Sequence, residues 1–574
     1  MRRLMLLAAL FGLMASHATG QTTTVDSGSL ESYIRLHYIK QEHLIPMRDG
    51  TELFTAIFIP RDTTTTYPIL MKRTPYSCAP YGLNNYPSGL GPGEHFVKAG
   101  YIFVNQDVRG RFMSEGTFQQ VTPHIPKKSG PNDVDESTDA YDTIEWLIKN
   151  VPGNNGKVGM AGISYPGFYA SAGMIDAHPA LAAVSPQAPV GDWYFDDFLH
   201  HGAFFLAHAY RWLNNNAHER QGPTTERAAA NVLPSVDGYQ MFLDAGTISE
   251  INRRYLKNSV PFWNDMMNHP NRDDFWQKRE ILPHLKNVAP AVMVVTGWFD
   301  AEDLYGSFKT YQSIEKLNPG VNNVLVVGPW IHGGWANGEG HQLGQVPFYS
   351  KTAAFYRAEI EFPFFEKYLK GKNLPAPEEA TVFETGSNVW RTFDNWPPKE
   401  AKKALLRLQS NGRLSVESSD GSKIVDTSPI DQNPADPGYD EYLSDPARPV
   451  PYTEVITNRM TVEYMVEDQR FASRRPDVLV YQTKTLTEDI TMAGPLMAQF
   501  DVTTTGSDAD FVVKLIDVFP DGSDPAALPN YQMMVRSEVL RGRFRNSYEK
   551  PESFQADKPS TIRLELLDVL HRFR

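Results

Sequence analysis

A serine stands where an apolar strand-like run meets a helix-like segment, in Gly162-Ile163-Ser164-Tyr165-Pro166-Gly167. A serine hydroxyl is an effective nucleophile only when it is exposed, aimed and next to a base, and a tight strand-to-helix turn provides the exposure and the aim. Such turns usually carry a glycine two residues after the serine, whereas here Pro166 takes that place and Gly167 follows. A turn of this composition also occurs as a plain connection, so the prediction of a nucleophile depends on finding a base.

An aspartate and a histidine each follow a predicted buried strand. Asp300 comes just after the apolar run at 291–296, and His332 comes just after the next such run, at 324–327. Reactive groups of open α/β sheets gather at the carboxyl ends of the strands, and the order Ser, Asp, His is that of an α/β-hydrolase. Taken alone, His332 is equally well explained as a loop histidine bonded to backbone. The three positions together predict a Ser-His-Asp triad of Ser164, His332 and Asp300.

These residues require a sheet whose strands end at one edge. Apolar runs alternate with helix-like segments along the first part of the chain, among them a helix at 135–148 capped by Asp135 and a helix starting at Glu302. This alternation predicts a mostly parallel sheet covered on both faces. The aromatic-rich stretch 192–285 interrupts it and is expected to form a helical cap over the strand ends.

The character of the sequence changes near residue 376. Short apolar runs separated by Pro, Asp and Gly predict a β jelly-roll, with expected strands at 404–408, 460–465, 478–482, 496–503 and 511–519. The fold class is therefore α/β: an α/β-hydrolase domain with a helical cap insertion, followed by a β jelly-roll domain. The expected ranges are 21–191 and 286–375 for the hydrolase domain, 192–285 for the cap and 376–574 for the jelly-roll.

Composition and charge narrow the class of protein. The 574 residues are 41% apolar with a net charge of −13, and no block of Lys or Arg is present, so no nucleic-acid partner is expected.

Arg2 and Arg3 precede an apolar run and then small residues, which predicts a secretory signal peptide over residues 1–20. We therefore expect a secreted or periplasmic protein with no membrane anchor after cleavage. Cys78 is the single cysteine, and CxxC and HExxH motifs are absent, so neither a metal nor another cofactor is expected.

Several motifs give the chain a resemblance to a known family. They are Lys72-Arg73-Thr74-Pro75-Tyr76, Asp107-Val108-Arg109-Gly110-Arg111, the Gly162–Gly167 turn, Gly297–Asp303, Gly328–His332 and Trp390-Arg391. With these the sequence resembles the X-prolyl dipeptidyl-peptidase-like hydrolases, a group that includes cocaine esterase, glutaryl-cephalosporin acylase-like proteins and the α-amino acid ester hydrolases. The resemblance covers nearly all of the chain after residue 20. In this group a proline after the Ser-Tyr pair is normal.

The resemblance implies roles for individual residues. Ser164 would be the nucleophile, His332 the general base and Asp300 its orienting acid. The Tyr76 hydroxyl and the backbone N–H of Tyr165 would form the oxyanion hole, although Tyr76 would also fit as a tyrosine simply packed near the turn. Asp107 and Arg109 would form a scaffold ion pair. Relatives continue past the end of this sequence, so we expect either a fragment or a jelly-roll that closes differently.

The residues after Asp300 narrow the substrate. The pattern Asp300-Ala301-Glu302-Asp303 resembles the α-amino acid ester hydrolases, which bind the substrate's α-ammonium group with an acidic cluster. Glu302 and Asp303 would be two members and Asp197 the third, with Asp196 an equally close neighbour. Carboxylates in a partly desolvated pocket attract a cation and repel N-acylated or anionic groups. Alternatively, Glu302 and Asp303 are helix-start residues, which the helix dipole favours by about 0.3–1 kcal/mol.

The sequence thus predicts an exported serine hydrolase that cleaves α-amino acid esters through an acyl-enzyme. Amides and short peptide-like substrates, and acyl transfer to amines such as β-lactam nuclei, fall within the same prediction. Alternatives are an X-prolyl dipeptidyl peptidase, a general carboxylesterase or acylase, and an inactive hydrolase fold used for binding. Members of the group often form homo-oligomers, and the sequence leaves the assembly of this chain open.

Overall fold

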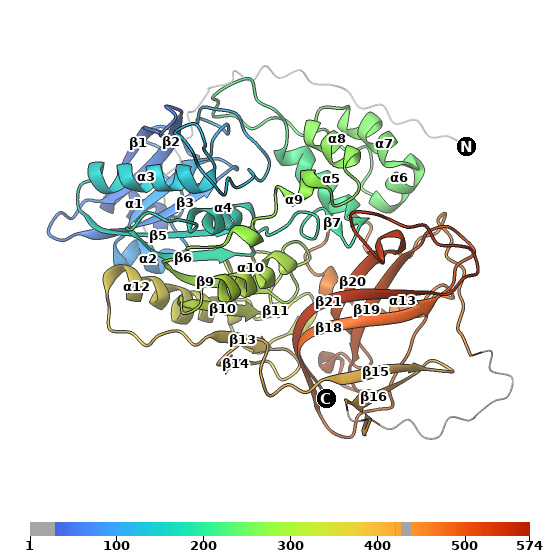
Figure 1. Cartoon of the computed structure of the whole chain (residues 1–574). Coiled ribbons are helices and arrows are strands. Elements are labelled where there is room, and N and C mark those ends of the chain that lie inside the picture. The colour runs from blue at the N-terminus through green and yellow to red at the C-terminus, as the bar shows by residue number, and fades with distance from the viewer. Residues whose placement is uncertain (1–28, 420, 426–437) are drawn as a thin grey trace, which may run out of the picture.

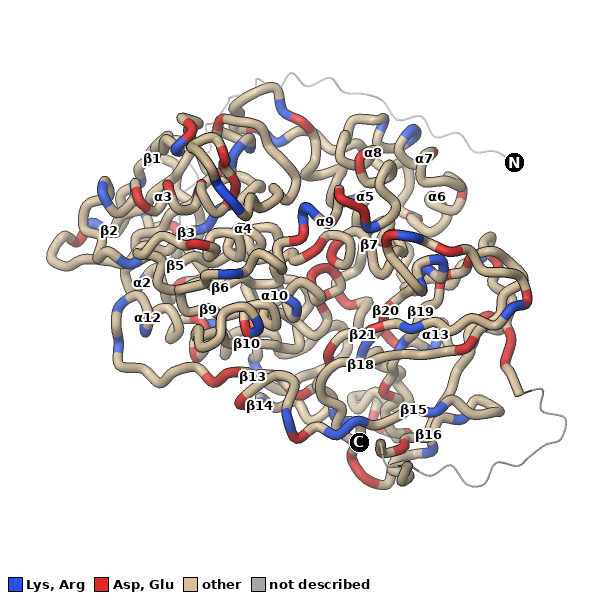
Figure 2. The backbone as a smooth tube through the Cα atoms, in the orientation of Figure 1, with Lys and Arg blue, Asp and Glu red and all other residues tan. Residues whose placement is uncertain are grey.

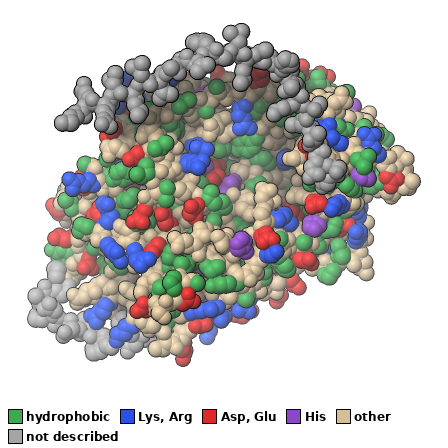
Figure 3. Space-filling model, turned by 180° about the vertical axis from the view of Figure 1, so that it is seen from behind, with side chains coloured by type: hydrophobic (Ala, Val, Ile, Leu, Met, Phe, Trp, Pro, Cys, Tyr) green, Lys and Arg blue, Asp and Glu red, His purple; other side chains and the backbone are tan. Residues whose placement is uncertain are grey.

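A computed structural model describes residues 29–419, 421–425 and 438–574 in a hydrolase lobe, a helical cap and a β-rich C-terminal lobe (Figure 1). The predicted signal peptide lies outside the described residues. Within those residues, no helix combines the length and the apolar character needed to span a bilayer. Basic and acidic side chains are interspersed over the described residues of the face in Figure 3.

The hydrolase lobe is built on one ten-stranded sheet. Its strands, in spatial order, are β1 (Tyr38–Pro46), β2 (Glu52–Pro60), β4 (Ile102–Asp107), β3 (Tyr67–Thr74), β5 (Asn154–Ile163), β6 (Leu181–Gln187), β9 (Ala291–Gly297), β10 (Asn323–Gly328), β13 (Ala380–Glu384) and β14 (Val389–Phe393). From β4 to β13 the neighbours run parallel, and the outer strands pair antiparallel. The carboxyl ends of β5, β9 and β10 therefore meet at one edge, as the triad requires.

Helices cover both faces of the sheet. One face carries α3 (Glu136–Asn150), α4 (Tyr165–Gly173) and α10 (Leu304–Leu317), and the other carries α1 (Leu30–His37), α2 (Glu94–Ala99), α11 (Thr352–Phe355) and α12 (Phe362–Lys370), the last two joined by a π-helical turn (Tyr356–Glu361). Successive side chains of a strand point to opposite faces. Accordingly Val292 and Val294 of β9 belong to one core cluster, while Met293 and Val295 belong to the other.

The cap lies between β6 and β9, as expected. It consists of β7 (Leu199–His200), β8 (Ala203–Phe204), α5 (Leu206–Asn216), α6 (Gly238–Ala245), α7 (Ile248–Ile251), a π-helical turn (Asn252–Leu256), α8 (Pro261–Asn268), α9 (Asp274–Gln277) and a 3-10 turn (Leu282–His284). After β10, the short hairpin β11 (Gln342–Leu343) and β12 (Val346–Pro347) precedes α11.

The C-terminal lobe is β-rich, as predicted. A three-stranded sheet contains β15 (Ala404–Gln409), β16 (Arg413–Ser418) and β17 (Lys423–Val425), while β18 (Ile490–Val502) pairs with β21 (Ser560–Phe573) and β19 (Asp510–Val518) pairs with β20 (Gln532–Arg541). Short helices at Tyr464–Val466, Arg470–Ser473, Pro525–Ala527 and Gly542–Phe544 complete the lobe.

Three local predictions were wrong. The strand predicted at 460–465 is replaced by a 3-10 turn, because consecutive residues Met465 and Val466 are both buried there and a strand would turn one of them outward. The run 478–482 makes only an isolated bridge, from Gln482 to Arg413. The helix predicted from Glu302 begins at Leu304, because the Asp300 carboxylate holds the two preceding backbone N–H groups in a turn.

Candidate active site

The turn between β5 and α4 holds Ser164 in a strained conformation. Its backbone has φ 68° and ψ −130°, a combination that is unfavourable for a residue with a Cβ, and its N–H donates to the Gln187 carbonyl at 2.9 Å. A Cβ on Gly162 would lie 2.2 Å from the Pro166 carbonyl oxygen, and one on Gly167 would lie 2.6 Å from that of Gln187. Both glycines are therefore required by close backbone approach. Strain retained at a surface-facing serine is typical of a nucleophile.

The histidine and the aspartate of the predicted triad are hydrogen-bonded. His332 Nδ1 lies 2.9 Å from Asp300 Oδ2, while Asp300 Oδ1 accepts the backbone N–H groups of Glu302 (2.8 Å) and Asp303 (3.0 Å). The His332 loop packs beside the nucleophile turn, since a Cβ on the next residue, Gly333, would lie 3.6 Å from Cγ2 of Ile163. With Nδ1 bound to the carboxylate, Nε2 is the nitrogen left for proton transfer.

Carboxylates surround the His332 imidazole. Burial opposes the charged ring, but the negative charges of Asp300 and Glu302 outweigh it and raise the pKa of His332 to about 10. Glu302 Oε2 lies 3.5 Å from His332 Nε2, on the side opposite to the Asp300 contact. The imidazole is thus placed between two acceptors.

Two donors are available for an oxyanion. The Tyr76 hydroxyl accepts the indole N–H of Trp212 at 3.1 Å, and this leaves its own proton for a substrate oxygen. Burial, and secondarily the charge of Asp197, raises the pKa of Tyr76 well above its ordinary value, which keeps that proton in place. Tyr165 is the first residue of α4, where backbone N–H groups have no intrahelical partner. The rings of Tyr76 and Tyr165 pack edge to face at 6.4 Å.

The acidic residues gather beside the triad, where α10 and the cap meet β20 (Figure 2). Asp197 takes a left-handed backbone conformation, φ 55°, and its N–H donates to the Glu302 carbonyl at 2.9 Å. His208 lies between the two carboxylates, with Nε2 3.1 Å from Asp197 Oδ1 and Nδ1 3.8 Å from Glu302 Oε1. The structure thus brings together the predicted acidic residues and one histidine that was not predicted.

Asp303 is the least satisfied member of the cluster. It is fully buried, and neither of its side-chain oxygens has a hydrogen-bond partner. It occupies the N-cap position of α10 but makes no capping bond, so helix capping does not account for its side chain. Burial, together with the charges of Asp197 and Asp196, raises the pKa of Asp303 well above its ordinary value. A buried carboxylate without a partner is costly unless a ligand pairs with it.

The choice between the two neighbouring aspartates follows from their partners. Asp196 accepts the backbone N–H groups of Gly191 (2.9 Å), Asp192 (3.1 Å) and Gly306 (2.7 Å), so its carboxylate holds the cap to α10. Asp197 instead faces His208 and accepts the indole N–H of Trp193 at 2.8 Å. Asp197 is therefore the better placed of the two to contact a ligand.

Sequence reasoning missed His208 and Trp212, and it did not connect Trp193, an aromatic residue of the predicted cap, with Asp197. All three belong to the cap, and no local motif marks them; only their contacts with Asp197 and Tyr76 single them out. Asp197, His208 and Glu302 also offer one ligand atom each within 4.8 Å of one another. Because His208 Nε2 is already bonded to Asp197, the group is accounted for as an ion-pair network, and we assign no metal to it.

The predicted ion pair of Asp107 with Arg109 was wrong. Arg109 pairs with Asp49 (2.7 Å) and Asp139 (2.7 Å), whereas Asp107 accepts the Cys78 backbone N–H at 2.8 Å. Asp107 is fully buried under the strand ends, where backbone and hydroxyl donors hold it without an arginine. The resemblance implied a pair of Asp107 with Arg109, but the turn after β4 separates their side chains.

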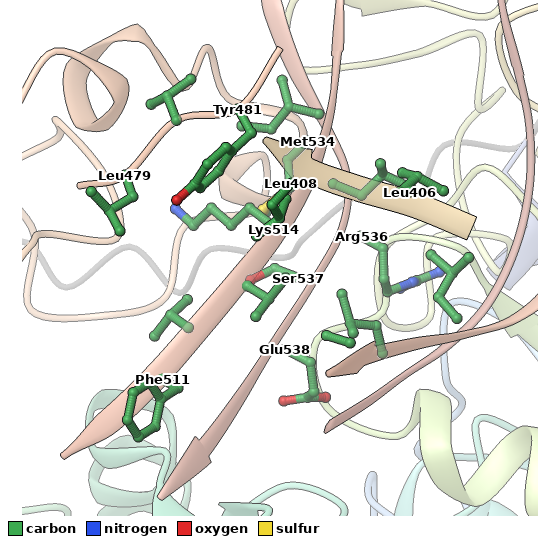
Figure 4. A pocket seen from close by; sticks show the side chains of 18 of the residues that line it. Leu406, Leu408, Leu479, Tyr481, Phe511, Lys514, Met534, Arg536, Ser537 and Glu538 are labelled. Atoms are coloured by element: carbon green, nitrogen blue, oxygen red, sulfur yellow. The ribbon is translucent and has the colours of Figure 1, made fainter. Parts of the chain in front are cut away.

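A cavity of about 3810 Å³ opens beside the site. Asp300 and Glu302 line it together with cap residues such as Phe195 and Phe204 and with strands and loops of the C-terminal lobe. Figure 4 shows apolar side chains such as Leu406, Leu408 and Met534 in that part, together with the charged Arg536 and Glu538. Glu302 is therefore the member of the acidic cluster that faces a chamber with room for substrates larger than an amino acid ester.

Comparison with known proteins places this site in a family context. Residues 49–334 match the family model described as X-Pro dipeptidyl-peptidase (S15 family), and residues 375–574 match the X-Pro dipeptidyl-peptidase C-terminal non-catalytic domain. Among curated proteins, the cocaine esterase of Rhodococcus sp. (strain MB1 Bresler) is 27% identical over 541 residues, covering 92% of this chain and 88% of its own length.

Two solved structures are similar over almost the whole chain. An aminopeptidase from the marine sediment archaeon Thaumarchaeota archaeon is 33% identical with a TM-score of 0.83, covering 98% of this chain and 90% of its own. An α-amino acid ester hydrolase is 31% identical with a TM-score of 0.81, covering 98% of this chain and 91% of its own.

Proposed function

Because the chain belongs to the X-Pro dipeptidyl-peptidase (S15) family of serine hydrolases, we propose that it hydrolyses esters of α-amino acids whose amino group is free. The observation that carries this proposal is Asp303, a fully buried carboxylate whose oxygens make no hydrogen bond and whose ion-pair contact is with His332 Nδ1 at 3.9 Å; the charges of Asp197 and Glu302 also act on it. An α-ammonium group offers a positive charge and three N–H donors, as a lysine ammonium does. Such a group would supply the hydrogen bonds that the Asp303 carboxylate lacks.

Uncharged and N-acylated substrates would be disfavoured at the same position. They would leave Asp303 buried and without a hydrogen bond while displacing water, and an unsatisfied buried polar group costs about 1–3 kcal/mol. The structural neighbours agree in kind, since one is named an aminopeptidase and the other an α-amino acid ester hydrolase. Both names describe substrates with an amino group next to the reacting carbonyl.

The proposed reaction uses the triad and the two oxyanion donors. Ser164 Oγ attacks the ester carbonyl while His332 Nε2 accepts its proton, and Tyr76 and the Tyr165 N–H bind the oxyanion. His332 then gives the proton to the departing alcohol as the carbon–oxygen bond breaks. Water repeats the sequence on the acyl-enzyme and frees the amino acid. An amine in place of water, such as a β-lactam nucleus, would give acyl transfer.

The experiment compares phenylglycine methyl ester with its N-acetylated and deaminated analogues near neutral pH, with Ser164→Ala as the blank. We expect a strong preference for the free amine that Glu302→Gln and Asp303→Asn abolish. Glu400→Gln, which removes an exposed carboxylate from the wall of the same cavity, is the matched control and should keep the preference. Equal turnover of all three esters by the wild type would refute the proposal and favour a general carboxylesterase or acylase.

A second candidate is an X-Pro dipeptidyl peptidase, which the description of the matching family model favours. That activity also requires a site that binds a free N-terminus, but this N-terminus belongs to the residue two positions before the scissile bond. A dipeptide-proline amide assayed beside phenylglycine methyl ester separates the two. Faster cleavage of the amide in kcat/KM would replace the ester hydrolase proposal by the peptidase.

A further inference from the structure

Glu302 lies beside the nitrogen that the catalytic base needs. Its Oε2 lies 3.5 Å from His332 Nε2, while Asp300 Oδ2 lies 2.9 Å from His332 Nδ1. A neutral imidazole has a single N–H, whereas a carboxylate only accepts hydrogen bonds. Between two carboxylates the ring is fully satisfied only as imidazolium. Glu302 Oε2 makes an ion-pair contact with Nε2 rather than a hydrogen bond, and together with Asp300 it favours the form of the ring in which Nε2 carries a proton.

A general base must hold its lone pair open toward the nucleophile. While Nε2 carries this proton, His332 cannot take the proton of Ser164. The same Glu302 belongs to the cluster assigned above to the substrate ammonium, and its other oxygen, Oε1, already faces the His208 imidazole at 3.8 Å. A cation arriving at Asp303 and Glu302 would compete with His332 for the Glu302 carboxylate.

We propose that the substrate's ammonium group switches on the catalytic histidine: by binding Glu302 and Asp303 it releases Nε2 of His332 to act as the base for Ser164. This inference rests on the proposed function and adds a coupling between amine recognition and chemistry. The proton that leaves His332 goes to solvent, and the neutral ring keeps its Nδ1–H on Asp300. Nε2 then accepts the Ser164 proton as Oγ bonds to the carbonyl carbon, and returns it to the departing alcohol.

The charged groups around His332 support the direction of this effect. Burial disfavours the imidazolium, but the neighbouring carboxylates hold the pKa of His332 at about 10 in the unliganded site. Carboxylates come from the loop before α10 and from the cap, and the remaining titratable groups come from the cap and the C-terminal lobe: Asp300, Glu302, Asp303, Asp197, His208, Tyr464 and Arg536. His208 and Arg536 offset part of this negative charge, and the Asp303 oxygens make no hydrogen bond.

The test separates the ammonium group from the ester. Methyl phenylacetate, the deaminated analogue of phenylglycine methyl ester, is hydrolysed by the wild type over a pH series, with and without methylammonium chloride. Sodium chloride keeps the ionic strength equal. Below its pKa a base loses activity about tenfold per pH unit, so the neutral ester alone should show an alkaline pH–rate limb. Methylammonium should move that limb toward neutral pH and accelerate hydrolysis at pH 7 saturably, by at least about tenfold.

Two variants form the second part of the experiment. Glu302→Gln removes the carboxylate from Nε2, so its pH–rate limb for the neutral ester should already lie near neutral pH and methylammonium should have no further effect. Glu400→Gln should respond as the wild type does. The coupling would be overturned if methylammonium left the pH–rate limb of the wild type unchanged and Glu302→Gln had the same limb as the wild type. If the preference for free amines persists in that case, the proposed function stands without it; if the wild type shows no such preference, the proposed function itself fails.

Discussion

Replacing Gly162 by alanine is expected to displace the nucleophile. The new Cβ would lie 2.2 Å from the Pro166 carbonyl oxygen and 2.4 Å from its carbonyl carbon, both backbone atoms that cannot rotate away. An ordinary van der Waals contact begins near 3.4 Å, so the first turn of α4 must retreat from β5 by about 1 Å. That turn carries Ser164 at its start and the Tyr165 N–H next to it.

The magnitude follows from this shift. A misplacement of about 1 Å at reacting groups can lower kcat about 10²-fold, and forcing a Cβ into a packed site costs about 1–3 kcal/mol of stability. We therefore expect Gly162→Ala to lose about two orders of magnitude in kcat with a lower thermal midpoint. Purified protein would be assayed on phenylglycine methyl ester, with unfolding followed by calorimetry.

Two other glycines supply controls. Gly130→Ala adds a Cβ in open space and should match the wild type in both readouts. Gly173→Ala, at the far end of α4, brings a Cβ 2.9 Å from Cε of Met160, the flexible end of a side chain that can move aside, so it should keep most of the activity. The reasoning would be refuted if Gly162→Ala kept the kcat and the thermal midpoint of Gly130→Ala.

Three further predictions address the triad, the oxyanion hole and the contact between lobes. Asp300→Asn should lower kcat by about 10³–10⁴-fold in a folded protein, because an amide no longer fixes the His332 tautomer; a loss below about tenfold would contradict that role. Tyr76→Phe should lower kcat by about 10²–10³-fold with little change in KM, and an unaltered kcat would exclude its hydroxyl as an oxyanion donor. Burial opposes the charge of Glu538, but His200 and His201 outweigh it and lower its pKa from the ordinary 4.5, so the stability it contributes is present at neutral pH and is lost as the pH falls below that value. Burial also opposes the charge of His200, but Glu538 outweighs it and raises the pKa of His200 from the ordinary 6.5, so the contribution of His200 to the pair is present below pH 6.5 and is lost as the pH rises through the raised pKa. Glu538→Gln should therefore lower the thermal midpoint clearly at about pH 6 and less at about pH 9, and equal effects at both would argue against the ion pair.

The candidate triad could be proposed from the sequence because its signals are local. A strand-to-helix turn around Ser164 and the residues that end β9 and β10 are visible in the chain, and parallel strands bring their ends together. The resemblance to S15-family hydrolases, made on those motifs, is confirmed by the family matches, and so is the α/β-hydrolase core with its helical insertion and β-rich C-terminal domain.

What could not be predicted depends on contacts between distant segments. His208 contacts Glu302 only because the cap folds back over α10. Trp212 contacts Tyr76, which lies 136 residues earlier in the chain. The choice of Asp197 over Asp196 required knowing which carboxylate the Gly191 and Gly306 amides capture. The predicted strands at 460–465 and 478–482 were wrong because an apolar run does not by itself determine strand pairing: Met465 is buried in a 3-10 turn, whereas Leu479 and Val480 are exposed.

The most direct test of the account is the identity of the acyl-enzyme. Rapid mixing with the p-nitrophenyl esters of phenylglycine and of N-acetylphenylglycine, followed by an acid quench and peptide mass analysis, would locate the covalent adduct. We predict an adduct of the free amino acid on Ser164 that Ser164→Ala abolishes, with far slower labelling by the N-acetylated ester. An adduct on another residue, no adduct at all, or equal labelling by both esters would contradict a serine hydrolase that selects substrates by their ammonium group.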